Sequence, residues 1–298
     1  MKTLLSALEL TLGLALIQLF VTLFPYLFLR KKQLSIIRKL LFFTFRDYLF
    51  ATIYLFVFTY LAKLSEWFEG DWTIAKAPLF IIAVLIMNGY FFLVHPFVLK
   101  YDKCRLTFNP EYSATLSENL QKKVSVYITN NDTINAFATG FLPQNRVIVM
   151  GRGLLEKLTQ EEREAILYHE VGHHKHYDLI KFYFVVVLQC ILLGCFRQPF
   201  FDLVHQFYPS FNEGNLIFWY GCLIGLFYVI IFSKISHSAE YQADQYGAQH
   251  TSNQAMGNAL LKLSELTEHI VDQGSMTHPS IEKRLANIQF QVLPAPAS

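Results

Sequence analysis

The sequence predicts a mainly α-helical, multi-pass membrane protein of about five spans, with an α+β domain that carries a small β-sheet. Hydrophobic residues make up 53% of the 298 residues and charged residues only 16%, a more apolar balance than soluble proteins usually have. The apolar residues gather in long runs, and short β-type runs lie between the third and fourth of these. The net charge of +2 is too small to indicate a nucleic-acid partner.

The long apolar runs predict the membrane spans, because a helix of about 20 apolar residues crosses a bilayer. The first run has only Lys2 before it and Arg30-Lys31-Lys32 after it, which favours an uncleaved span over a signal peptide. We expect spans at residues 4–29, 48–64, 77–99, 179–196 and 216–235. Residues 1–99 would then be an N-terminal membrane region with three spans, and residues 100–298 a second domain that the last two spans interrupt.

Lysine and arginine residues orient these spans. The segments after the first, third and fifth spans are basic, and those after the second and fourth are not. The positive-inside rule therefore places residues 30–46, 100–178 and 236–298 in the cytoplasm. Residues before the fourth span and residues after the fifth span would then face the same compartment.

The segment between the third and fourth spans contains signals for a sheet and for one helix. Short β-type runs occur at residues 124–128, 134–139 and 146–150, which predicts a small sheet. Thr159 and Glu162 have the T-x-x-E spacing of a capping box, so we expect a helix to begin there.

Within this helix, His169-Glu170-Val171-Gly172-His173 reads H-E-x-x-H. Positions i and i+4 share one face of a helix, so His169 and His173 can bind one metal ion. Glu170 stands beside the first histidine, where its carboxylate can take a proton from a water molecule at the metal. The alternative is a polar surface helix whose histidines bind nothing, because a hydrolytic zinc site also needs a third ligand.

Two positions are candidates for the third ligand, and Glu240 is the better of them. His176 follows His173 by one turn, and we favour a packing or supporting role for it. Glu240 and Asp244 are four residues apart on a helix that should continue out of the fifth span. One carboxylate can bind the metal while the other accepts a hydrogen bond from a ligating histidine. Two solvated acids on a helix remain the alternative.

Four motifs in this order resemble the HtpX / CAAX prenyl protease family of integral-membrane zinc metallopeptidases, the gluzincins. The resemblance covers about residues 100–290. It rests on Asn135-Ala-Phe-Ala-Thr-Gly140, on the HEVGH segment at 169–173, on AEYQADQYGA at 239–248, and on Thr277-His278-Pro279-Ser280 with Arg284 after it. The chain departs from many relatives at His237-Ser238-Ala239, where these carry arginine just upstream of the third ligand.

This resemblance implies a zincin-like α+β metalloprotease domain with one Zn²⁺ per subunit. It implies the metal ligands His169, His173 and Glu240, the general base Glu170, a supporting Asp244, an oxyanion-stabilising His278, and a substrate-binding strand at Asn135, Ala136 and Phe137. The activity implied is that of a zinc metalloendopeptidase, which cleaves membrane proteins or lipidated peptides near the cytoplasmic surface in quality control or processing. A receptor-type signalling metalloprotease and a catalytically inactive membrane scaffold are the alternatives.

The position of the ligands agrees with a site close to the membrane. His173 stands about six residues, or roughly 9 Å of helix, before the fourth span. Glu240 follows the fifth span by about five residues, roughly 8 Å of helix. We therefore expect the site at the inner surface of the bilayer, in the cell or inner membrane if the chain is bacterial.

Overall fold

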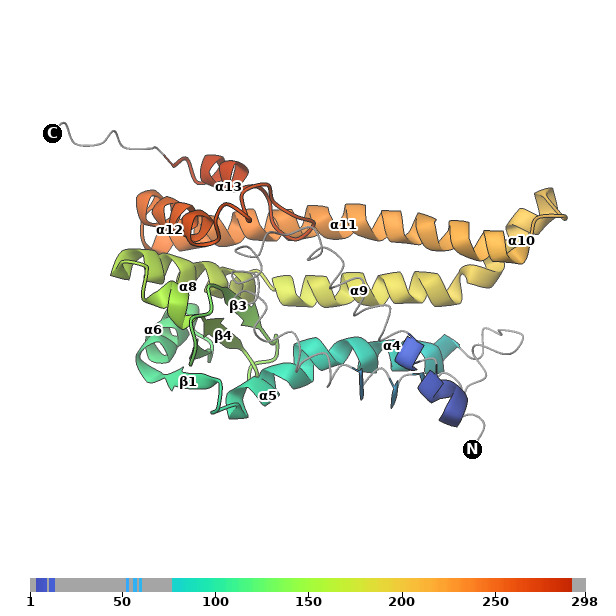
Figure 1. Ribbon diagram of the computed structural model, residues 1–298, viewed down its shortest axis with the longest axis horizontal. Helices are drawn as coiled ribbons and strands as arrows, with labels where there is room; N and C mark the ends of the chain where they lie inside the picture. The colour runs from blue at the N-terminus through green and yellow to red at the C-terminus, as the bar shows by residue number, and fades with distance from the viewer. Residues whose placement is uncertain are drawn as a thin grey trace. The chain divides into compact units, whose positions relative to one another are not determined.

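The structure, a computed structural model, describes residues 77–290 together with residues 4–9, 11–13, 52–53, 56–57 and 59–60 (Figure 1). Most of the first two predicted spans, 4–29 and 48–64, therefore lies outside the described residues. The chain divides into two compact units. Of the continuous described part, residues 77–91 and 183–231 belong to the first unit, and residues 92–182 and 232–290 to the second. The domain boundary expected at residue 100 stays a prediction.

Apolar helices form the first unit. Parts of helices α9 (Asp178–Cys195) and α11 (Glu213–His250) belong to this unit. Both helices are long and apolar enough to cross a membrane. They coincide with the predicted fourth and fifth spans. Helix α10 (Arg197–Phe207), which was not predicted, lies between them in the chain, and its Phe201 packs against Tyr220 of α11.

The predicted third span is helical but divided. It consists of α4 (Ala77–Gly89), the π-helix η3 (Tyr90–Val94) and α5 (His95–Tyr101). Pro96 stands in the first turn of α5, where the missing N–H of proline is tolerated, so the proline does not end the helical segment.

The second unit contains a four-stranded mixed sheet of order β1-β2-β4-β3. The strands are β1 (Leu106–Asn109), β2 (Ser125–Thr129), β3 (Ala136–Thr139) and β4 (Val147–Met150). β2 pairs with β4 in parallel, and the other two pairs are antiparallel. The predicted β-type runs overlap β2, β3 and β4, and β2 extends one residue beyond its predicted run. The sequence did not reveal β1, which has only four residues and half-exposed side chains.

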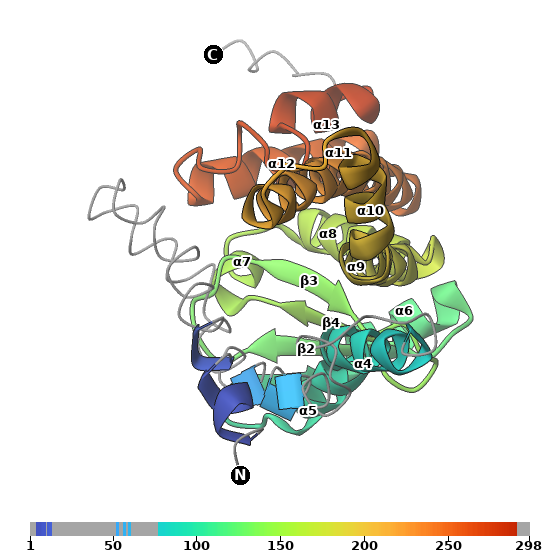
Figure 2. The same cartoon turned by 90° about the vertical axis from the view of Figure 1, so that its right-hand side faces the viewer.

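Helices α6 (Pro110–Leu120) and α8 (Gln160–Lys175) pack against the sheet, and further helices stacked on α8 complete the core of the second unit (Figure 2). The other helices around this core are α7 (Arg152–Leu155), α12 (Asn253–Leu266), α13 (Ile281–Asn287) and the end of α11. α8 packs between the sheet and α12, with buried Leu167 and Val171 in the same core as Ile148 of β4 and Leu260 of α12. The capping box predicted at Thr159 and Glu162 starts α8.

Candidate active site

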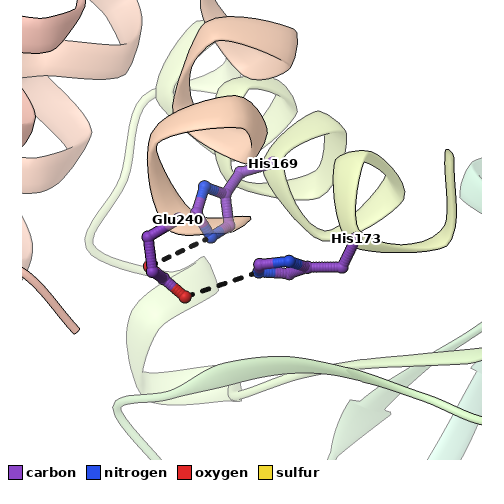
Figure 3. A group of neighbouring side chains, drawn as sticks. All are labelled: His169, His173 and Glu240. Carbon is purple, nitrogen blue, oxygen red and sulfur yellow. Dashed lines mark ion pairs between the residues drawn. The ribbon is translucent and has the colours of Figure 1, made fainter. Parts of the chain in front are cut away.

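Three side chains from two helices converge in the second unit. Figure 3 shows His169 and His173 of α8 pointing toward Glu240 of α11. Nε2 of His169 lies 3.8 Å from Oε2 of Glu240, and Nε2 of His173 lies 3.6 Å from Oε1. The two imidazole rings are nearly perpendicular, at 86°. All three residues are buried.

This donor set fits a tetrahedral zinc ion. One ligand atom from each residue can be chosen so that all lie within 4.8 Å of one another. Bonds of about 2.0–2.1 Å around Zn²⁺ keep ligand atoms roughly 3.4 Å apart, close to the distances between Glu240 and the two imidazoles. Two imidazoles and one carboxylate are also a ligand set that suits zinc and leaves a fourth position open.

A carboxylate stands behind each histidine. Nδ1 of His169 lies 2.9 Å from Oδ1 of Asp244, as the spacing of Glu240 and Asp244 led us to expect. Nδ1 of His173 lies 3.1 Å from Oδ2 of Asp178, the first residue of α9. Such contacts hold each ring with Nε2 toward the metal position. The role of Asp178 was missed, and its only sequence signal is an acid at the start of an apolar run.

Arg284 of α13 neutralises the acids of the site. Its Nη2 donates to Oδ1 of Asp244 at 2.6 Å, its Nε donates to Oδ2 at 2.8 Å, and Nη2 also lies 3.3 Å from Oε2 of Glu240. Burial alone would lower the pKa of Arg284, but the contacts with Asp244 and the charge of Glu240 raise it. The guanidinium is therefore charged. Residues 237–239 lack the arginine expected just upstream of Glu240. Arg284 of α13 supplies a positive charge beside Glu240 and Asp244.

Two glycines let the ligand helices approach closely. A Cβ atom at Gly172 would lie 2.9 Å from Cα of Ala243, and one at Gly247 would lie 2.8 Å from the carbonyl oxygen of Ala165. Real Cβ atoms do not come this near to a main chain, so α8 and α11 can touch only where these side chains are absent. This contact brings Glu240 within reach of the paired histidines.

A cavity of about 300 Å³ is lined by two of the three converging residues, His169 and Glu240. Its polar edge includes Glu170, Glu240 and His278, and Asn135 and Ala136 line it beside β3. The rest is mainly apolar, with Leu154, Ile166, Leu260, Leu263, Ile270, Val271 and Ile281. The cavity therefore places a carboxylate, Glu170, next to the metal position and beside an apolar surface.

The predicted substrate strand forms an edge of the sheet. β3 pairs with β4 on one side, with Phe137 opposite Val149, and no described strand pairs with its other side. Asn135 and Ala136 face the cavity, whereas Phe137 is not among its lining residues. An extended peptide can add to such an edge through main-chain hydrogen bonds.

A loop between α12 and α13 carries His278 to the site. Nδ1 of His278 lies 3.1 Å from Oε1 of Glu240, and more than half of its side chain is exposed. Two residues of α11 hold this loop, since Ser236 Oγ donates to the Thr277 carbonyl at 2.6 Å and His237 Nε2 lies 2.8 Å from the Ser275 carbonyl. The sequence did not predict that Ser236 and His237 hold this loop.

Two other histidines of α8 lie apart from the ligand group. His176, for which we favoured packing, caps the end of α8, and its ring contacts the edge of Tyr246. His174 is buried, and this burial, with the nearby charge of Arg146, lowers its pKa to about 3. His174 is therefore neutral at physiological pH.

A model of Peptidase family M48 matches residues 112–291, which is more than half of the chain. The chain belongs to peptidase family M48. The matched residues include the whole ligand group, its supporting acids and Arg284. The predicted family resemblance is thereby confirmed.

Curated M48 relatives agree with this assignment. Protease HtpX of Legionella pneumophila (strain Philadelphia 1) is 35% identical over 167 residues, which cover 52% of this chain and 57% of the relative. A Protease HtpX homolog of Methanocaldococcus jannaschii is 32% identical over 151 residues, covering 49% of this chain and 53% of the relative. The match thus spans little more than half the length of these relatives.

One solved structure is also similar in fold. The crystal structure of S. mikatae Ste24p has a TM-score of 0.57 and 18% identity, and covers 93% of this chain and 74% of that chain. At this identity the similarity concerns the fold alone. It agrees with a mainly helical chain that carries a small sheet.

Metal binding is expected to weaken as the pH falls. Burial alone would lower the pKa of His173, but its hydrogen bond to Asp178 and the charges of Glu240 and Glu170 raise it to about 9. Nε2 binds a metal only after losing its proton, so below pH 9 the affinity should fall about tenfold per pH unit. Zinc titrations against a competing chelator at pH 6, 7 and 8 measure this slope. A zinc affinity that stays constant over this range would contradict the claim that His173 is protonated before the metal binds.

Proposed function

We propose that the chain is a zinc-dependent endopeptidase of the membrane, which hydrolyses peptide bonds of membrane-associated proteins near the cytoplasmic surface. The observation that carries this proposal is the convergence of His169, His173 and Glu240, with Glu170 beside them on the wall of an apolar cavity. Membership of family M48 and the names of the HtpX relatives support it.

The reaction needs a metal, a base and groups that hold the peptide. A bound Zn²⁺ would polarise the scissile carbonyl group and lower the pKa of a water molecule. Glu170 would accept a proton from the attacking water and pass it to the leaving amine. His278, at the rim of the cavity, would donate a hydrogen bond to the oxyanion.

The remaining side chains position these groups. Asp244 and Asp178 would keep Nε2 of the two histidines toward the metal, and Arg284 would stabilise the negative charge of Glu240. The edge of β3 near Ala136 would pair with the main chain of the substrate, while the apolar cavity would receive one of its side chains.

The elements that carry the ligands support a membrane setting. α8 ends at Lys175, α9 begins at Asp178, and Glu240 lies within α11 itself. Both α9 and α11 meet the length and composition of a membrane span. We infer a multi-pass protein of about five spans, with a cytoplasmic site that acts on membrane proteins or lipidated peptides in quality control or processing.

Metal analysis and two matched substrates test this function. Purified wild-type chain should contain about one zinc per subunit and lose it in His169→Ala, because two ligands hold Zn²⁺ poorly. A peptide tethered to the membrane should be cleaved faster than the same peptide in solution, because the bilayer concentrates it at the site. Equal metal content in both proteins would refute the zinc site, and equal cleavage rates would refute the membrane substrate.

A further inference from the structure

Basic side chains surround Tyr177 in the short connection between α8 and α9. Nζ of Lys122 donates to the Tyr177 hydroxyl at 2.9 Å and lies 4.6 Å from the ring centroid. The hydrogen bond and charge of Lys122, followed by the charges of Arg146 and Lys175, lower the pKa of Tyr177. We name Lys122, Arg146, Lys175 and Tyr177 the Tyr177 basic cluster.

Arg146 is the unusual member of this cluster. Its side chain is only 7% exposed, and no described residue forms an ion pair with it or accepts a hydrogen bond from its guanidinium group. It lines a cleft of only about 10 Å³ together with Phe141, His173, His174, Tyr177 and Leu179, so an anion can meet it only at the mouth of this cleft. A buried cation without a partner costs several kcal/mol. The cleft therefore offers a positive charge that an anion can stabilise.

Asp178, which follows Tyr177 in the chain, does not supply this anion. Both oxygens of Asp178 are already engaged, Oδ2 by His173 at 3.1 Å and Oδ1 by Nζ of Lys181 at 2.8 Å. Farther along the surface, Lys123 adds a positive charge close to Lys100 at the end of α5. The described surroundings of Arg146 are thus basic.

The place of the cluster in the chain indicates where the anion comes from. Tyr177 is half-exposed and directly precedes α9, and Leu179 of the cleft is already part of that apolar helix. Tyrosine is enriched where a helix leaves the bilayer, and lipid phosphates lie at that depth. Basic residues at this level attract anionic lipids by about 1 kcal/mol each.

We propose that the Tyr177 basic cluster binds the phosphate group of an anionic phospholipid. Arg146 donates to the phosphate oxygens at the mouth of the cleft, Lys122 and Lys175 neutralise the charge from the surface, and Tyr177 packs beside the headgroup. This inference rests on one part of the proposed function, namely that α9 crosses the membrane.

Native mass spectrometry of the full chain in neutral detergent tests the site, with phosphatidylglycerol and phosphatidylcholine as probes. Wild-type chain should retain phosphatidylglycerol at least about tenfold more tightly than the double variant Lys122→Gln/Lys175→Gln, since two charge contacts of about 1 kcal/mol each are lost. Phosphatidylcholine should bind both proteins equally. The matched control Lys157→Gln/Lys283→Gln removes two exposed lysines elsewhere and should bind like wild type.

Three outcomes overturn the proposal. Equal retention of phosphatidylglycerol by the wild type and the cluster variant excludes the site. A loss of equal size in the control variant shows a general charge effect. Displacement of the lipid by equimolar inorganic phosphate assigns the site to a free anion. Lipid mass is measured without hydrolysis, so this result is independent of whether the chain cleaves peptides.

Discussion

Replacing Glu170 with glutamine is expected to slow peptide hydrolysis about a thousandfold and leave the metal in place. Glu170 lies on the cavity wall beside His169 but is not one of the three converging ligands. Glutamine keeps the shape of the side chain and cannot accept the proton of the attacking water. General-base catalysis contributes about 10²–10⁴-fold, so kcat should fall by about three orders of magnitude. Cleavage assays on protein of known zinc content measure the change.

The matched control is Glu164→Gln, an acid earlier in α8 that does not line the cavity. It should leave kcat unchanged. Hydrolysis that persists in Glu170→Gln at the wild-type rate would contradict the assigned base. A cellular phenotype that survives this substitution would favour the catalytically inactive scaffold over the peptidase.

Replacing Arg284 with methionine should destabilise the second unit more than any single ligand change. Arg284 is buried and pairs with Asp244 through two hydrogen bonds and with Glu240 at 3.3 Å. Its loss leaves two buried carboxylates without their cation, and breaking such a pair costs about 3–5 kcal/mol. The midpoint of thermal unfolding, measured without added metal in detergent, should fall markedly.

A double variant separates the loss of the Arg284 charge from the loss of its packing. In the double variant Arg284→Met/Asp244→Asn, one of the unpaired acids is neutral, so part of the lost stability should return. Zinc should bind this variant more weakly than wild type, because the amide supports His169 less well than the carboxylate. Unfolding midpoints that are additive for the two changes would show that Arg284 and Asp244 are not coupled.

Local patterns in the sequence predicted the centre of the site. The capping box at Thr159 and Glu162 starts α8, and the helical period places His169 and His173 on one face. The spacing of Glu240 and Asp244 likewise needs only a helix, which α11 provides. These placements on helices could be predicted because each depends on residues about one helical turn apart, whereas the roles of the residues stay predictions.

Features that depend on distant packing were not predictable in this way. Asp178 reaches His173, five residues before it, only because α8 ends in a turn that contains Tyr177, a non-glycine residue with a φ of 59°. Arg284 reaches Asp244 only through the packing of α13. The strand β1 exists because it pairs with β2, and its four residues carry no strong signal of their own. The π-helix η3 within the third predicted span also left no mark in the hydropathy.

The glycine contact between α8 and α11 makes the metal site vulnerable to changes that touch none of its donors. Gly172 immediately precedes His173, and its neighbour Ala243 follows Glu240 by less than one turn. Even a single methyl group at this crossing would wedge the two backbones apart by a few tenths of an ångström. Substitutions at Gly172 could therefore separate Glu240 from the two histidines while all three residues stay intact.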